Sequence, residues 1–112
     1  MNSLRRPLIA GNWKMYLDLA SSVSLAKALA AGVPAAAPEV MVATPFTALA
    51  VVGEALKGSK VKLAAQDCYW EKEGAFTGQV SAFQLKDAGC QGVLIGHSER
   101  RQYFGETDET VK

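Results

Sequence analysis

Residues 94–101 read LIGHSERR, a stretch in which a short apolar run leads directly into a dense polar cluster. The run meets His97, the single histidine of the chain, and a hydroxyl, an acid and two arginines follow it. We predict that residues 92–98 form a strand whose carboxyl end carries these polar groups. In sheets of parallel strands, functional side chains gather at that end.

Three earlier apolar runs repeat this order and predict strands over 7–13, 39–45 and 61–67. Helical patterns lie between the strands and after the last one, at residues 18–32, 48–58, 81–89 and 107–112. Strands that alternate with helices pair in parallel through right-handed crossovers. The predicted fold class is therefore α/β.

The helix boundaries follow from capping residues. The candidate caps are Asp18, Ser21 or Ser22 for the first helix, Thr47 for the second, Ser81 for the third and Thr107 or Asp108 for the last. The first helix is expected to bury an apolar stripe made of Val23, Leu25, Ala26, Leu29 and Ala30.

Polar side chains lie at the carboxyl end of every predicted strand or directly after it. They are Asn12 and Lys14 after the first strand, Thr44 after the second, Gln66 and Asp67 after the third, and residues 97–101 after the fourth. Because these ends meet at one edge of a parallel sheet, this agreement supports both the fold and a functional site there.

The composition indicates a soluble globular protein. Of 112 residues, 49% are hydrophobic and 21% are charged, and the net charge is +1, which provides no general attraction to nucleic acid or to a membrane. Residues 1–13 contain an apolar run that is interrupted too early for a signal-peptide core. Cys68 and Cys90 fit no zinc or redox spacing, so a reduced, cytoplasmic protein is the simplest interpretation.

Three candidate residues also have simpler structural explanations. Lys14 lies where an ammonium can stabilise a phosphate or a developing oxyanion, although a single lysine is more often a solvated surface group. Asn12 either orients this lysine or serves as a turn residue. His97 suits acid, base or electrophilic roles, whereas a lone histidine on an apolar strand is more often a satisfied core group.

The neighbours of His97 favour the functional interpretation, because several polar groups at one strand end need partners. The alternative for residues 99–101 is an ion-pair cluster, either with Glu106 or with a partner chain. One histidine and two scattered cysteines supply no metal-ligand set. Ser98 lacks the glycines of a nucleophile elbow, and no phosphate-binding glycine loop occurs.

The segment 68–80 is a long connection that contains Tyr69, Trp70 and Phe76. A long loop rich in aromatic side chains is usually functional or part of an interface.

Several motifs together resemble the triosephosphate isomerase family. AGNWKM (10–15), GAFTG (74–78), IGHSERR (95–101) and FGETD (104–108) occur in the order and at the spacing of that family. The resemblance implies a TIM (β/α)8 barrel. It also implies an isomerase without a cofactor that interconverts dihydroxyacetone phosphate and D-glyceraldehyde 3-phosphate through an enediolate, in glycolysis and gluconeogenesis.

The same resemblance implies roles for individual residues. Asn12 and Lys14 would bind the substrate, and Lys14 would also stabilise negative charge. His97 would be a neutral electrophile beside the start of a short helix at about 98–104. Glu99 would be a supporting active-site acid, so the implied catalytic set is His97, Lys14 and Glu99.

The family resemblance also implies a homodimer in which residues 68–80 insert into the neighbouring subunit. Thr77 and Phe76 would lie in that interface, with Thr77 reaching toward Asn12 and Glu99 of the other copy. Gln79 stands where the family usually has a glutamate that pairs with the arginine at position 100. A neutral contact between Gln79 and Arg100 would replace that ion pair and weaken the dimer.

By this resemblance, residues 1–112 are the first four βα units of a single barrel domain, ending within its fourth helix. The family's proton-transferring glutamate would lie beyond residue 112, so the chain would need the remaining, carboxyl-terminal part of the barrel for activity. The alternative is a catalytically inactive half-barrel fragment used for folding or assembly.

Overall fold

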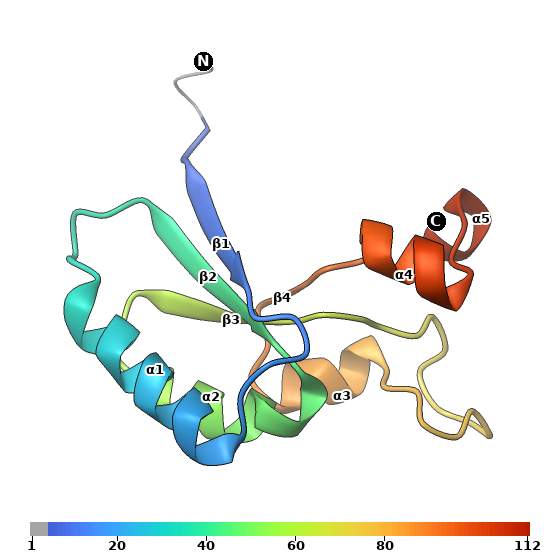
Figure 1. Ribbon diagram of the computed structural model, residues 1–112, viewed down its shortest axis with the longest axis horizontal. Coiled ribbons are helices and arrows are strands. Elements are labelled where there is room, and N and C mark those ends of the chain that lie inside the picture. Colours follow the sequence, from blue (N-terminus) through green and yellow to red (C-terminus); the bar gives the residue numbers. More distant parts are fainter. Residues whose placement is uncertain (1–4) are drawn as a thin grey trace.

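The computed structural model describes residues 5–112 and contains one four-stranded parallel sheet (Figure 1). The strands pair in chain order and are β1 (Leu8–Asn12), β2 (Glu39–Thr44), β3 (Val61–Ala65) and β4 (Gly92–Val93). Residues 1–4, which begin the segment assessed above for a signal peptide, lie outside the described residues. The parallel sheet confirms the predicted α/β class.

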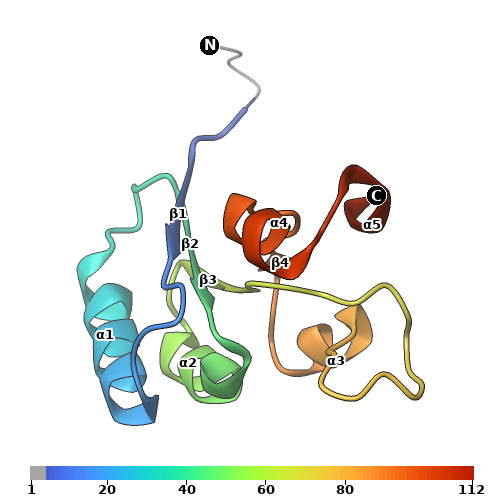
Figure 2. The same cartoon turned by 45° about the vertical axis from the view of Figure 1, so that its right-hand side comes forward.

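Helices connect the strands and follow the last one. They are α1 (Leu19–Gly32), the 3₁₀ turn η1 (Phe46–Ala48), α2 (Leu49–Leu56), α3 (Ala82–Asp87), α4 (Ser98–Phe104) and α5 (Asp108–Val111). Figures 1 and 2 show α1 and α2 side by side, and both pack against the sheet. Between residues 5 and 112, no helix is long and apolar enough to cross a membrane.

The core lies between the helices and one face of the sheet. Val42 of β2 and Leu63 of β3 pack there with Ala26 of α1 and Val52 of α2, and each of these residues is at most 3% exposed. Because side chains alternate along a strand, the intervening residues face the other side of the sheet.

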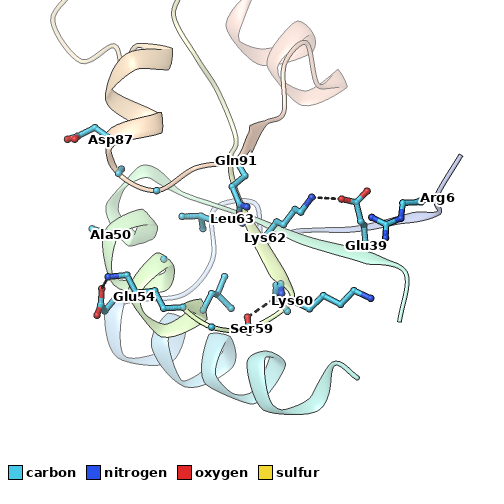
Figure 3. A pocket seen from close by; sticks show the side chains of 17 residues that line it. Arg6, Glu39, Ala50, Glu54, Ser59, Lys60, Lys62, Leu63, Asp87 and Gln91 are labelled. Carbon is cyan, nitrogen blue, oxygen red and sulfur yellow. Dashed lines mark hydrogen bonds and ion pairs between the residues drawn. The ribbon is translucent and has the colours of Figure 1, made fainter. Parts of the chain in front are cut away.

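Met41 and Ala64 lie on this second face. A Cβ added to Gly92 would come within 2.9 Å of Met41 Cε, the end of a flexible side chain that would have to shift to make room. Near the starts of β2 and β3, Glu39 and Lys62 form an ion pair on the same face (Figure 3). Each charged side chain thus has a partner of opposite charge, which lowers the free-energy cost of placing it on this face of the sheet.

The start of α1 agrees with the sequence, and so does most of its predicted stripe, because Ala26 is buried and Leu29 and Ala30 pack against the core. Asp18 caps the helix, with its side chain accepting from the Ser21 amide at 2.9 Å. The prediction for Leu25 is wrong, because this side chain is 39% exposed whereas Ser22 is completely buried. Ser22 and Ala26 are small residues one turn apart, and they allow α1 to approach its neighbours closely at the positions that the helix buries.

Thr47 does not cap α2, and this prediction is wrong. Thr47 lies inside η1, and the N-cap of α2 is Ala48, which has no side chain able to cap it. The chain instead enters the helix through a tight turn in which the Ala48 amide donates to the Pro45 carbonyl at 3.1 Å. The proline ring fixes φ for that turn, so the backbone itself provides the entry.

The predicted strand over 92–98 is wrong in length, because β4 contains residues 92–93 only. Strand-like hydrogen bonds extend to the Leu94 amide, which donates to Ala65 O at 2.9 Å. The chain then turns at Gly96, and α4 begins at Ser98. The histidine cluster therefore lies at a junction between a loop and a helix.

Ser81 caps α3 as predicted, through a capping box with Gln84 in which its Oγ accepts from the Gln84 amide at 3.2 Å. We expect Ser81→Ala to lower the free energy of unfolding of the full-length protein by about 1 kcal/mol, because the helix loses its cap. Urea denaturation measures this change. Ser24→Ala, an exposed change inside α1, is the matched control, and an equal effect of both variants would contradict the capping role.

Candidate active site

A pocket of about 240 Å³ lies at the carboxyl ends of the strands, where the sequence predicted a functional site. Four of its lining residues are the catalytic and substrate-binding candidates Asn12, Lys14, His97 and Glu99. The fold thus brings together side chains from the end of β1 and from the β4–α4 junction. Gln66, which follows β3, also lines the pocket and had no role assigned from the sequence.

Lys14 and Glu99 form the central ion pair of this pocket. Lys14 Nζ donates to Glu99 Oε1 at 2.7 Å, and both side chains are roughly half exposed, at 48% and 44%. The hydrogen bond to Glu99 raises the pKa of Lys14, and the same bond lowers the pKa of Glu99. The pocket therefore holds an ammonium group and an ionised carboxylate at neutral pH.

The Lys14 backbone is strained. Its φ is 53°, in the left-handed region that residues other than glycine rarely adopt and that costs on the order of 1–3 kcal/mol. The Lys14 amide donates to Asn12 Oδ1 at 3.0 Å, which closes a local turn and aims the lysine toward α4. Strain of this kind often marks a functional site.

His97 is the N-cap of α4. Its Nδ1 accepts a hydrogen bond from the Glu99 amide at 3.0 Å, so Nδ1 carries no proton. A longer 3.7 Å approach of Nδ1 to Glu99 Oε2 would be an ion pair only in a protonated ring, and the shorter bond to the amide excludes that arrangement. In the neutral ring, this acceptor role of Nδ1 leaves the proton on Nε2.

Gly96 sets the direction in which the chain enters this cap. Its φ is 62°, and an added Cβ would lie within 3.0 Å of both Val111 methyl carbons and within 3.1 Å of an Arg101 nitrogen. Only glycine combines this backbone conformation with contact against α5. The turn therefore fixes where His97 stands relative to Lys14.

Arg100 and Arg101 both form ion pairs. The pair between Arg100 and Glu106 is the one that the ion-pair alternative for residues 99–101 predicted. Arg100 Nε donates to Glu106 at 2.6 Å and lies 3.1 Å from Asp67, while Arg101 binds Asp108 at 2.7 Å. Arg100 therefore stabilises the junction of α4 with the chain around it. Its predicted contact with Gln79 stays a prediction.

Other parts of residues 5–112 offer less chemistry. No group of three potential metal ligands occurs in this range. Cys68 and Cys90 are free thiols whose pKa values are raised, chiefly by burial. A wider cavity of about 990 Å³ lies at the opposite ends of the strands (Figure 3). There Lys57 and Lys62 are paired with carboxylates, and Lys60 donates to the backbone carbonyls of Ala35 and Ala37, so these three cations are already engaged.

The Lys14–Glu99 pair makes a testable prediction about pH. Because the pKa of Glu99 is lowered on folding, its stabilising contribution is present above the ordinary glutamate pKa and is lost as the pH falls through the lowered value. An NMR titration of the Glu99 carboxyl carbon measures this midpoint, and we expect it to rise in a Lys14→Met variant. Equal midpoints in the two proteins would contradict the ion pair.

A parallel sheet covered by helices, with its polar site at the carboxyl ends of the strands, defines a (β/α) barrel of the TIM type, of which these residues form half. Residues 7–112 match the sequence model of the family described as triosephosphate isomerase. The chain belongs to the triosephosphate isomerase family.

Individual relatives agree with this assignment. The chain is 54% identical over 109 residues to a triosephosphate isomerase of Geotalea uraniireducens and 58% identical over 111 residues to one of Pelobacter propionicus. Each match covers 96% of this chain but 43% of the relative. The crystal structure of triosephosphate isomerase from Bartonella henselae superposes with a TM-score of 0.88 at 40% identity, over 95% of this chain and 44% of that one. The chain thus spans less than half the length of the curated relatives it matches.

Proposed function

We propose that the full-length protein containing this chain is a triosephosphate isomerase that interconverts dihydroxyacetone phosphate and D-glyceraldehyde 3-phosphate. The observation that carries the proposal is the convergence of Asn12, Lys14, His97 and Glu99 on one pocket at the carboxyl ends of the strands. Membership of the family supports the same reaction.

In this proposal the chain supplies the electrophilic side of the site. The reaction removes a proton from the carbon beside the substrate carbonyl, and negative charge develops on the carbonyl oxygen as the enediolate forms. The Lys14 ammonium stabilises that charge and the substrate phosphate, and the Nε2–H of neutral His97 donates a hydrogen bond to the reacting oxygens. Both groups act more strongly on the negatively charged oxygen of the enediolate than on the uncharged carbonyl of the bound substrate.

The proton-transferring base is expected from the remainder of the barrel. Glu99 is a poor candidate, because its hydrogen bond to Lys14 lowers its pKa and therefore its basicity. We therefore assign Glu99 to orienting Lys14. The separate 112-residue chain is expected to be inactive without the carboxyl-terminal part, and no cofactor is required by the proposed chemistry.

The direct test is an assay of the full-length protein with each triose phosphate. Conversion of glyceraldehyde 3-phosphate to dihydroxyacetone phosphate, and the reverse, should follow saturation kinetics without added metal or cofactor. Absence of both conversions in the folded protein would refute the proposal.

We further propose that the full-length protein is a homodimer formed through residues 68–80. This loop projects away from the sheet (Figure 1) and carries Trp70 and Phe76, which are 65% and 40% exposed. Tyr69 stacks on Trp70 at a ring distance of 4.2 Å and lies 4.8 Å from Phe76, which makes a preformed aromatic surface. Thr77 and Gln79 lie in the same loop, and sedimentation of the full-length protein tests the dimer.

The proposed reaction belongs to glycolysis and gluconeogenesis, and a cytoplasmic location is part of the same proposal. The unpaired cysteines support it, because thiols stay reduced in that compartment.

A further inference from the structure

Gln66 makes an unusual set of contacts at the floor of the pocket. Its side-chain nitrogen lies 2.9 Å from the Lys14 carbonyl, 2.9 Å from the Ala43 carbonyl and 3.2 Å from Asn12 Oδ1. All three neighbours are acceptors, so only the NH₂ group of the amide fits there, and the opposite orientation would place oxygen against oxygen. One side chain thus joins the ends of β1, β2 and β3.

These contacts complete the restraint on the strained lysine. The Lys14 amide donates to Asn12, and the Lys14 carbonyl accepts from Gln66, so side chains hold both backbone polar groups of the residue. A residue other than glycine keeps a left-handed backbone conformation only where several contacts with surrounding groups hold it there. Gln66 is the one group among these that comes from another strand.

The contacts also orient Asn12. Its Oδ1 accepts from both the Lys14 amide and Gln66, so its own NH₂ group points away from them. Within residues 5–112 that NH₂ group donates to no other atom. It is therefore presented as a donor to a ligand oxygen in the pocket.

We propose that Gln66 is a positioning residue, which holds Lys14 and Asn12 in the geometry that binds substrate and stabilises the enediolate. This inference rests on the proposed function. Gln66 acts through its neighbours, because its NH₂ group is already engaged with three protein oxygens.

The test replaces Gln66 by methionine in the full-length protein, which keeps the length of the side chain and removes its donors. We expect kcat/KM to fall by about 10-fold to 100-fold, because a small displacement of a charged group at the site is enough for such a loss. Gln91→Met makes the same replacement directly before β4, away from the pocket, where Gln91 accepts from the Leu63 amide in the middle of β3, and should leave kcat/KM unchanged.

A double-mutant cycle separates positioning from general destabilisation. If Gln66 acts through Lys14, the loss caused by Gln66→Met should be much smaller in a Lys14→Arg background, where the geometry of the ammonium is already altered. Additive losses in the two backgrounds would overturn the inference.

The remaining outcomes are also decisive. An active wild type with an unimpaired Gln66→Met variant would refute this inference alone, whereas an inactive wild type would refute the proposed function and this inference with it. Circular dichroism shows whether Gln66→Met folds. If it does not, Gln66→Asn takes its place, because asparagine keeps the amide but is too short to reach the same acceptors. Failure of both variants to fold would show a structural role and overturn positioning.

Discussion

Replacing His97 by asparagine should lower kcat of the full-length protein by about 10²-fold to 10³-fold, the usual effect of losing one donor to a developing oxyanion. The structure separates the two nitrogens of this ring. Nδ1 caps α4 by accepting from the Glu99 amide, and in the proposed reaction Nε2–H donates to the substrate. Asparagine retains an acceptor for the cap and lacks a group at the position of Nε2.

The comparison with His97→Ala gives this prediction its control. Alanine removes the donor and the cap together, so it should lose a similar factor in kcat and also about 1 kcal/mol of stability. Asparagine should lose activity with little change in the free energy of unfolding. Steady-state kinetics and urea denaturation measure the two effects. A His97→Asn variant with nearly normal kcat would show that Nε2 is not the electrophile.

The order of strands and helices was predictable because each element has a local signal. Short apolar runs mark the strands, and Asp18, Ser81 and Thr107 mark helix starts through bonds to residues three positions along. The errors arose where tertiary structure or backbone geometry decides. Thr47 has the right side chain for a cap, but Pro45 starts a tight turn before it.

The contacts among the active-site candidates could be predicted from the sequence only in part. The contacts of His97 with Glu99 and of Asn12 with Lys14 each span two residues, so local motifs contain both partners. The Lys14–Glu99 pair joins residues 85 positions apart, and only the order of the strands, or a family resemblance, brings them together.

The contribution of Gln66 had no sequence signal beyond its place at a strand end. Two of the three acceptors around its amide are backbone carbonyls, which every residue type supplies. The strain at Lys14 was equally hidden, because nothing in the residue type indicates a left-handed φ. Features that depend on backbone geometry therefore required the structure.

Replacing Lys14 by methionine should reduce kcat/KM of the full-length protein by about 10³-fold or more, the largest loss expected from any change in this chain. Arg100 also lines the pocket but is paired with Asp67 and Glu106, so in the proposed function the Lys14 ammonium is the cation that meets the substrate phosphate and the charge that develops during reaction. Its loss should therefore raise KM and lower kcat together. Stability should hardly change, because an exposed ion pair such as Lys14–Glu99 contributes little to folding.

Two further variants show whether this loss comes from a charge at one position. Lys27→Met removes an equal charge from the exposed side of α1 and should leave kcat/KM intact. Lys14→Arg keeps the charge but spreads it over a planar group that cannot replace a compact ammonium in the same turn, so it should remain well below wild type. Near-normal kcat/KM in Lys14→Met would remove Lys14 from the site. Full activity in Lys14→Arg would show that charge alone, and not the strained turn that aims it, is what the site requires.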